Sequence, residues 1–372
     1  MVLNLTAAGF TGGEAEELRR AFGFKRSEKR MREIEVKLRA GMDRNDITGE
    51  TQNKIVKSIT SFAMFGFPES HAASFALLAY ASAYLRTYYL AAFTCALLNN
   101  QPMGFYQPAT LIKDAQRHGL RVLPVDINLS RSVCSIENFH IRLGFNYVRG
   151  LHKAAIEGIM REQPFSSIDD LARRVPELRK ENTERLAAIG ALNSIGAKHR
   201  RDALWQAAWS SKPAGELVRT VPEAAAPVAP LTQMTIEERL IADCAGTGMT
   251  IGKHPMAYRR AEMDQLKVVP AARLFSIANG RTVRVAGNVI VRQRPGTAKG
   301  ILFLSLEDET GISNVVIMPD LFKEQQLNIL THPWVMVEGQ MQNVDGVVHI
   351  LAKQVFPLTN PLDLGTHSHD FH

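Results

Sequence analysis

The sequence predicts a multidomain α+β protein, with a mostly helical region that contains helix–hairpin–helix motifs, followed by a small β-barrel of the OB type. Three observations support this prediction. Apolar residues recur at helical spacing through most of residues 14–208. Residues 210–232 are rich in proline and alanine and too poor in large apolar side chains to fold. Between residues 281 and 357, five strand-like segments are separated by glycine and aspartate turns.

The composition indicates a basic, folded protein with unpaired thiols. The chain has 372 residues and a formal net charge of +7, which suits a polyanionic partner such as nucleic acid. Its three cysteines form no C-x-x-C pair, so we expect free thiols in a reducing cytoplasm rather than disulfides or a thiolate zinc site. The apolar stretch 72–98 is interrupted by Arg86, and we interpret it as a pair of buried core helices rather than a membrane span.

The elements before residue 100 are all predicted to be helices. Acidic residues stand early and basic residues late in the first of them, as the helix dipole favours. Thr48 is a candidate cap, the segment FAMFGFPESHAA is interpreted as a loop, and Ser70 is expected to cap the helix that starts at His71. The expected helices are 14–40, 48–60, 71–86 and one ending near residue 99.

After residue 110 the pattern becomes mixed and then returns to helix. The order is a short amphipathic helix (111–120), an extended segment (121–128), two short strands (134–145), helices (148–208), the linker (210–232), a helix (235–243) and the five strands.

Two basic features near the amino terminus are candidates for binding phosphate. The helix that carries Lys25, Arg26 and Lys29 has enough cations on one surface to neutralise phosphates. A solvated amphipathic helix explains the same residues equally well. Ser70 at a helix start leaves backbone N–H groups for an anion, and the neighbouring His71 is a second donor. Taken without context, a simple cap and a turn histidine explain that pair better.

A tandem glycine motif is the strongest nucleic-acid signal in the helical region. Val148-Arg149-Gly150-Leu151 and Ala188-Ile189-Gly190-Ala191 each place a glycine between small or apolar residues near helices. Such a glycine lets backbone N–H groups approach a duplex phosphate without reading bases. The flanking candidates are Arg149 and Lys153 for the first motif, and Lys198 and Arg200 for the second. A pair of glycine-capped helical turns is the alternative.

The barrel segment offers a basic hairpin but few aromatic residues. Arg292, Arg294 and Lys299 cluster there, and OB barrels bind single strands through basic, aromatic faces. Phe303 and Trp334 lie in apolar runs and are expected in the core, so the barrel offers basic residues but few aromatic rings for binding a single strand. We find no pattern of a two-metal carboxylate site, a P-loop or a zinc protease, so no metal-binding or catalytic residue is assigned to this chain.

Read in order, these segments resemble a known family. GFTGGEAEELRRAFGFKRSEKRM and GFPESHAASFALLAYASAYLRTYYLAAFTCALLNNQPMGFYQP resemble the fingers region of bacterial C-family DNA polymerases. RLGFNYVRGLHKAAIEGIMREQPFSSIDDLARRV and RLAAIGALNSIGAKHRRDALW are similar to the family's tandem helix–hairpin–helix domain. TGMTIGKHPM is similar to the signature that precedes its OB domain, so the resemblance extends over nearly the whole chain.

Within that family the sequence favours the error-prone, alpha-type branch. LLNNQPMGFYQP resembles the error-prone version of that block, the chain ends shortly after the barrel in THSHDFH, and the linker lacks a Q-x-D-L-F type clamp-binding peptide. A replicative DNA polymerase III alpha subunit cut at both ends stays open, as does a non-catalytic DNA-binding remnant. Met1 falls inside the fingers, so a fragment, a truncated product or half of a split gene is expected.

The resemblance implies a nucleotidyltransferase that adds deoxynucleotides to a primer using Mg²⁺, in damage-induced mutagenesis and translesion synthesis. The family's palm, with its catalytic aspartates, matches nothing here, so the isolated chain is expected to be inactive and to bind no Mg²⁺ itself. Lys25, Arg26, Lys29, Ser70 and His71 match blocks expected to contact the incoming dNTP. The expected partners are double-stranded and primer–template DNA, dNTP, single-stranded DNA at the barrel and accessory proteins of the error-prone polymerase cassette, with no membrane.

The implied domain boundaries follow the changes of pattern. They are a partial fingers domain (1–130), a tandem helix–hairpin–helix domain (131–209), a flexible linker (210–234), a connecting segment (235–280), an OB domain (281–358) and a tail (359–372).

Overall fold

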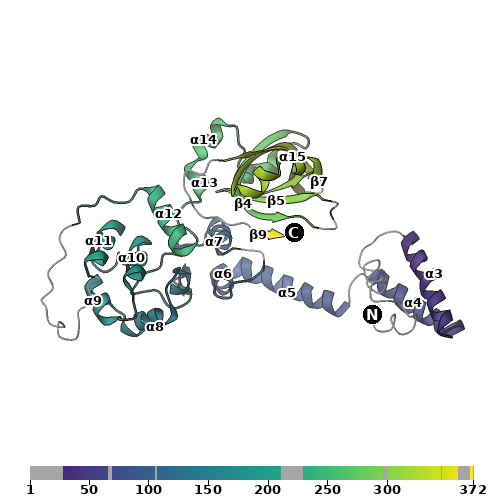
Figure 1. Cartoon of the computed structure of the whole chain (residues 1–372), viewed down its shortest axis with the longest axis horizontal. Helices are drawn as coiled ribbons and strands as arrows, with labels where there is room; N and C mark the ends of the chain where they lie inside the picture. The colour runs from purple at the N-terminus through teal and green to yellow at the C-terminus, as the bar shows by residue number, and fades with distance from the viewer. Residues whose placement is uncertain are drawn as a thin grey trace. The chain divides into compact units, whose positions relative to one another are not determined.

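A computed structural model of the chain describes residues 28–65, 69–104, 107–210, 229–295, 298, 300–344, 346–358 and 369–371. The chain divides into two compact units, Met1–Tyr88 and Tyr89–His372 (Figure 1). Most of the expected linker lies outside the described residues.

The first unit contains a helical hairpin of α3 (Glu28–Arg44) and α4 (Gly49–Phe65). Leu38, Met42 and Val56 form its small buried core. The Arg39 guanidinium donates to Asn53 at 2.8 Å and so ties the two helices together. The helix α4 continues to Phe65, whereas the sequence indicated a loop from FAMF onward, because no glycine or proline interrupts the chain before Gly66.

The helix α5 (Glu69–Tyr88) differs from the expected buried helix. Its side chains from His71 onward are exposed, with Leu77 at 71% and Tyr80 at 74%. Apolar residues occur all around it, so no single face is set apart for a core. None of the helices in the described part of the chain combines the length and the hydropathy that crossing a membrane requires.

The second unit begins with a helical region built around one apolar core. Helices α6 (Leu90–Asn99) and α7 (Pro108–Arg117) share this core with α8 (Lys153–Glu162), α9 (Ile168–Arg174), α10 (Lys180–Ala188) and α11 (Arg200–Ser210). A three-stranded sheet in the order β1-β3-β2 joins them, formed by β1 (Val122–Leu123), β2 (Ser135–Glu137) and β3 (His140–Arg142), followed by the short turn η1 (Phe145–Tyr147). These elements follow the predicted order. Cys95, Cys134 and Cys244 are buried and unpaired.

Short helices connect this region to the barrel. The helix α12 (Ile236–Thr247) begins at a capping box in which Thr235 and Glu238 bond each other's backbone, and it ends at Gly248, whose φ is 76°. It is followed by α13 (Pro255–Tyr258), α14 (Arg260–Gln265) and η3 (Ala271–Ser276).

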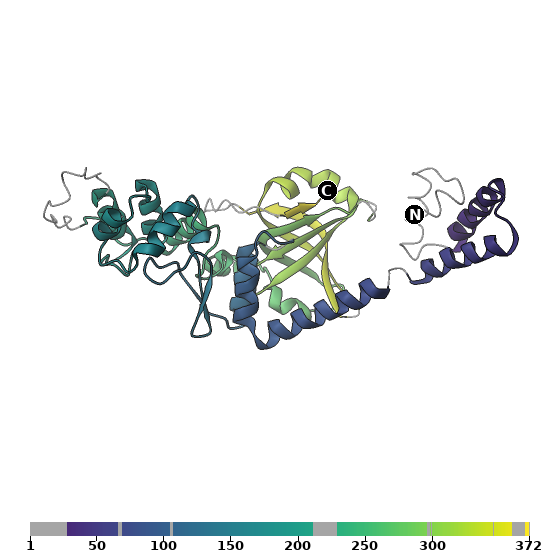
Figure 2. The same ribbon diagram turned by 90° about the horizontal axis from the view of Figure 1, so that it is seen from below.

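The predicted OB-type barrel is confirmed. Its strands are β4 (Thr282–Gln293), β5 (Leu302–Glu307), β6 (Ile312–Ile317), β7 (Trp334–Val344) and β8 (Val347–Pro357). They pair in the order β5-β6-β8-β7-β4, and a β4–β5 pairing closes the ring, while β9 (His369–Phe371) runs parallel to β4. The helix α15 (Pro319–Thr331) was not predicted, and it packs against the barrel through Phe322 and Ile329 (Figures 1 and 2).

Candidate nucleic-acid interface

The first glycine motif forms a turn directly before a helix. Gly150 has a φ of 73°, and α8 begins three residues later at Lys153. The Lys153 side chain is 90% exposed, and its ammonium group lies 3.7 Å from the Glu157 carboxylate. A turn of this kind places backbone groups and an exposed cation at the start of the helix, where phosphate is favoured.

The second motif differs from its expected geometry. Gly190, with a φ of 84°, follows the last turn of α10 and so ends a helix rather than preceding one. The glycine that precedes α11 is Gly196, whose φ is 94° and whose missing Cβ would meet open space. Gly196 is therefore the counterpart of Gly150. Its signal in the sequence was the glycine followed directly by small and basic residues.

The turn at Gly150 is held from α10. The Asn182 amide donates to the Gly150 carbonyl at 2.8 Å, and the Arg185 guanidinium donates to the Arg149 carbonyl. A Cβ on Gly150 would collide with that guanidinium. The sequence did not single out Arg185, because its role depends on a contact 36 residues away.

The basic residues at the second motif divide into one structural and one exposed side chain. Arg200 is an interhelical clamp, since its guanidinium lies 2.7 Å from Asp243 of α12 and its side chain is only 16% exposed. Lys198 is exposed, and its backbone N–H donates to Asp202 at 2.8 Å. Of the pair expected to contact DNA, Lys198 is exposed, whereas Arg200 is paired with Asp243.

The basic residues of the barrel that were expected to bind DNA also include one structural and one exposed side chain. Arg292 is 5% exposed, and it donates to the carbonyls of Ile329 and His332 at 2.8 and 2.7 Å. It therefore stabilises the end of α15, and its expected place on an exposed DNA-binding face is wrong. Arg294 is exposed and lies over the Phe322 ring at 4.7 Å. Lys299 lies outside the described residues.

The aromatic side chains of the barrel were only partly placed correctly from sequence. Trp334 is buried at 3%, as expected, but Phe303 is 38% exposed and lies outside the barrel core, because its side chain points away from the inward-facing Leu302 and Leu304. An exposed aromatic ring such as that of Phe303 offers a surface on which a base can stack.

The candidate dNTP contacts belong to the first unit, and only some are described. Lys25 and Arg26 lie outside the described residues, and Lys29 lies in the first turn of α3. Ser70 is the second residue of α5, which begins at Glu69, so it stands inside the helix rather than as its cap. His71 is exposed, with its ring 4.4 Å from that of Phe75. Their expected convergence on a triphosphate stays a prediction.

Metal ligands were also sought among the acidic residues, histidines and cysteines. Within the described ranges, no three of these side chains lie close enough together to hold a metal ion.

Comparison with known proteins agrees with this geometry. A family model described as a helix-hairpin-helix motif matches residues 119–203, and one described as an OB-fold nucleic acid binding domain matches residues 275–358. The chain is 42% identical over 373 residues to the error-prone DNA polymerase of Corynebacterium efficiens, covering 100% of this chain and 34% of that protein. It is 42% identical over 367 residues to the error-prone DNA polymerase of Aromatoleum aromaticum, covering 95% of this chain and 34% of that protein.

A third relative, error-prone DNA polymerase 2 of Rhizobium meliloti, is 38% identical over 379 residues and covers 97% of this chain. The chain spans about a third of the length of the curated relatives it matches.

Proposed function

We propose that this chain is the part of an error-prone DNA polymerase that holds the DNA. Nearly the whole chain aligns with such enzymes and covers about a third of their length. The observation that carries the proposal is the pair of left-handed glycine turns, at Gly150 and Gly196, that stand ahead of α8 and α11 inside the matched helix-hairpin-helix region.

The proposed grip on duplex DNA is independent of sequence. Lys153 and Lys198 are exposed beside the two turns, so phosphates of the backbone are their natural partners. Contacts of this kind fix the position of a duplex without reading its bases. On the barrel, Arg294 is an exposed cation and Phe303 is an exposed aromatic ring, the two kinds of side chain that single-strand binding uses.

The activity of the whole enzyme is proposed by homology. It is template-directed deoxynucleotide addition during damage-induced mutagenesis and translesion synthesis in the cytoplasm, alongside accessory proteins of the same pathway. Metal-dependent chemistry is proposed for the complete enzyme, where the resemblance assigns Mg²⁺ to the aspartates of the palm. Lys25, Arg26, Lys29 and His71 are proposed to contact the incoming dNTP in that enzyme.

The experiment that tests this function is a binding and extension assay on the purified full chain. We expect similar affinity for primer–templates of unrelated sequence, a strong decrease of affinity with salt, and no primer extension with dNTPs and Mg²⁺. Transplanting the chain in place of the matching third of the Corynebacterium efficiens enzyme should retain extension. A folded chain that does not bind DNA, or a stable chimaera that does not extend primers, would overturn the proposal.

A further inference from the structure

The helix α12 contacts both glycine motifs, although it lies outside the matched helix-hairpin-helix and OB-fold segments. The backbone N–H of Arg149, the residue before Gly150, donates at 2.8 Å to the carbonyl of Gly246 in the last turn of α12. The last carbonyls of a helix have no partner within the helix. This bond therefore fastens the start of the Gly150 turn to the end of α12.

The second motif packs on the same glycine. Gly246 is buried, and a Cβ there would collide with Cγ2 of Ile189, the residue before Gly190. Gly246 has no left-handed φ, so lack of space rather than backbone conformation excludes a side chain. Glycine within a helix costs about 1 kcal/mol relative to alanine, and the close approach of Ile189 accounts for its presence here. One glycine thus contacts the second residue of each motif.

Arg200 adds a side-chain link between the second motif and α12. Its guanidinium donates to the Ala188 carbonyl at 3.3 Å and to the Asp243 carboxylate at 2.7 Å. The Thr250 hydroxyl donates to the same carboxylate at 3.2 Å. The Asp243 side chain is therefore held from two sides and ties the end of α10 to α12.

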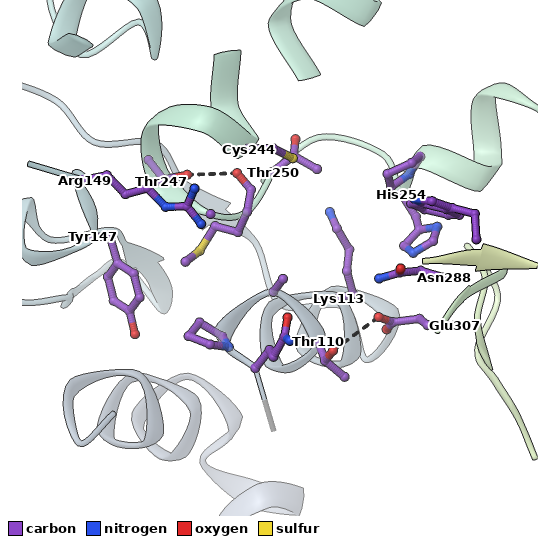
Figure 3. Close-up of a pocket in the computed structure, with 17 residues that line it drawn as sticks. Thr110, Lys113, Tyr147, Arg149, Cys244, Thr247, Thr250, His254, Asn288 and Glu307 are labelled. Atoms are coloured by element: carbon purple, nitrogen blue, oxygen red, sulfur yellow. Dashed lines mark hydrogen bonds between the residues drawn. The ribbon is translucent and has the colours of Figure 1, made fainter. Parts of the chain in front are cut away.

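The Arg149 side chain also contacts the end of α12. Its guanidinium lies against Gly248, the residue directly after the helix (Figure 3). There it lines a cavity of about 310 Å³ that Lys113 and Asn288 also line. Both the backbone and the side chain of Arg149 thus meet the last turn of α12.

The helix α12 is itself fixed by packing on the barrel. Leu240 and Cys244 belong to an apolar cluster that includes Met256 and Trp334 of the barrel. Leu240 and Cys244 are four positions apart and so share one face of the helix, whereas Gly246 lies on another. The two motifs therefore rest on a common support that the rest of the second unit holds in place.

We propose that Gly246 is a positioning residue of the duplex grip, a role that rests on the function proposed above. Its contacts with Arg149 and Ile189 fix the spacing between the two motifs. Lys153 and Lys198 then reach phosphates of one duplex together. Two contacts on one rigid support bind without a further cost of ordering, and independent movement of either motif loses part of that gain.

The test measures the affinity of the full chain for duplex DNA by fluorescence anisotropy, with and without Gly246→Ala. The added methyl group meets Ile189 and pushes the helix end away from Arg149, so affinity should fall about tenfold. Lys153→Glu should then cost much less affinity than it does in the wild-type chain, because a displaced turn no longer presents Lys153 to the phosphate. Loss of this coupling is a readout that simple destabilisation does not produce.

Matched variants show whether the effect comes from the contact with Ile189. Leucine has no Cγ2 methyl group but nearly the same volume, so Ile189→Leu should restore most of the affinity to Gly246→Ala. Ile189→Val keeps that methyl group and should restore none. The control Gly311→Ala makes the same chemical change where the new Cβ meets only Ala271, at 3.6 Å, and should bind DNA as the wild type does.

A second variant tests the same support without adding volume. Asp243→Asn weakens the bond from Arg200 and should reduce the cost of Lys198→Glu, as Gly246→Ala does for Lys153→Glu. Where Gly246→Ala does not fold, an undiminished cost of Lys198→Glu in Asp243→Asn overturns the positioning role.

The outcomes separate this role from the proposed function. A wild-type chain that does not bind duplex DNA overturns both. Where the wild type binds and Lys153→Glu weakens binding, wild-type affinity in Gly246→Ala overturns the positioning role alone. Lower affinity in Gly246→Ala with an undiminished cost of Lys153→Glu means a general loosening of the fold, and this also overturns it.

Discussion

Arg117 of α7 and Glu307 of β5 form an ion pair of 2.9 Å between the helical region and the barrel, with 18% and 4% of their side chains exposed. The Thr110 hydroxyl donates to the same carboxylate at 3.4 Å. Burial raises the pKa of Glu307 to about 7, against the opposing pull of Arg117 and Lys113. The junction between the two regions is therefore fastened by a group that titrates near neutral pH.

The first prediction concerns the pH dependence of that junction. A carboxyl group whose pKa is raised on folding binds more protons in the folded chain, so its contribution to the free energy of unfolding falls as the pH rises from about 4.5 to about 7. Glu307→Gln removes this dependence. Denaturant unfolding should show that the difference in free energy of unfolding between the wild type and the variant changes by at most about 1.4 kcal/mol per pH unit. Parallel stability curves for the two proteins would contradict the prediction.

The second prediction concerns His254, whose contribution to stability changes with pH in the opposite direction. Burial, with Lys113 and Arg117 adding to it, lowers the pKa of His254 from 6.5 to about 3, so the unfolded chain takes up a proton that the folded chain does not. Stability is then lost as the pH falls from about 6.5 towards 3. The variant His254→Asn keeps an acceptor for the Met256 N–H and should lose less stability in that range.

The matched control for His254 is an exposed histidine. His118 is half exposed, so the variant His118→Asn should follow the wild-type stability curve. If both variants behave alike, burial at His254 is not the cause of the acid sensitivity.

The third prediction concerns the duplex grip. Reversing the charge of both Lys153 and Lys198 should weaken binding to unrelated duplexes by similar factors. It should also lower the salt slope by about 0.9 for each phosphate contact that is lost. Fluorescence anisotropy at several salt concentrations measures both quantities. Lys353→Glu, an exposed change on β8, serves as the control, and a loss restricted to one DNA sequence would refute a phosphate-only grip.

The fourth prediction separates the two arginines at the end of β4. Arg292→Met should lower the free energy of unfolding by about 2 kcal/mol, because the carbonyls of Ile329 and His332 lose a charged donor. Arg294→Met should change stability by less than about 1 kcal/mol, since only an exposed contact over Phe322 is lost. It should instead reduce affinity for a single-stranded oligonucleotide. Equal stability losses in the two variants would contradict the structural role of Arg292.

The sequence by itself determined the order and type of most elements. The strands of the barrel were recognisable because alternation and turn residues are local properties of the chain. The helix–hairpin–helix region was recognisable because a glycine followed by basic residues is a local pattern that indicates a phosphate-binding turn. The helix α15 was not predicted because its segment, PDLFKEQQLNILT, lies between strands. Its helical conformation is stabilised by the packing of Phe322 and Ile329 on the barrel.

The tertiary structure alone decided which basic residues face solvent and which hold the fold together. Arg292 and Arg294 stand two positions apart in the sequence, yet one is buried under α15 and the other is exposed, because burial depends on an element about 30 residues further along. Gly190 and Gly196 could be told apart only once the end of α10 and the start of α11 were fixed. Lys113 and Asn288 line the same cavity although they are far apart in the sequence. No local sequence pattern predicts this proximity, because it depends on the packing of the barrel against α7.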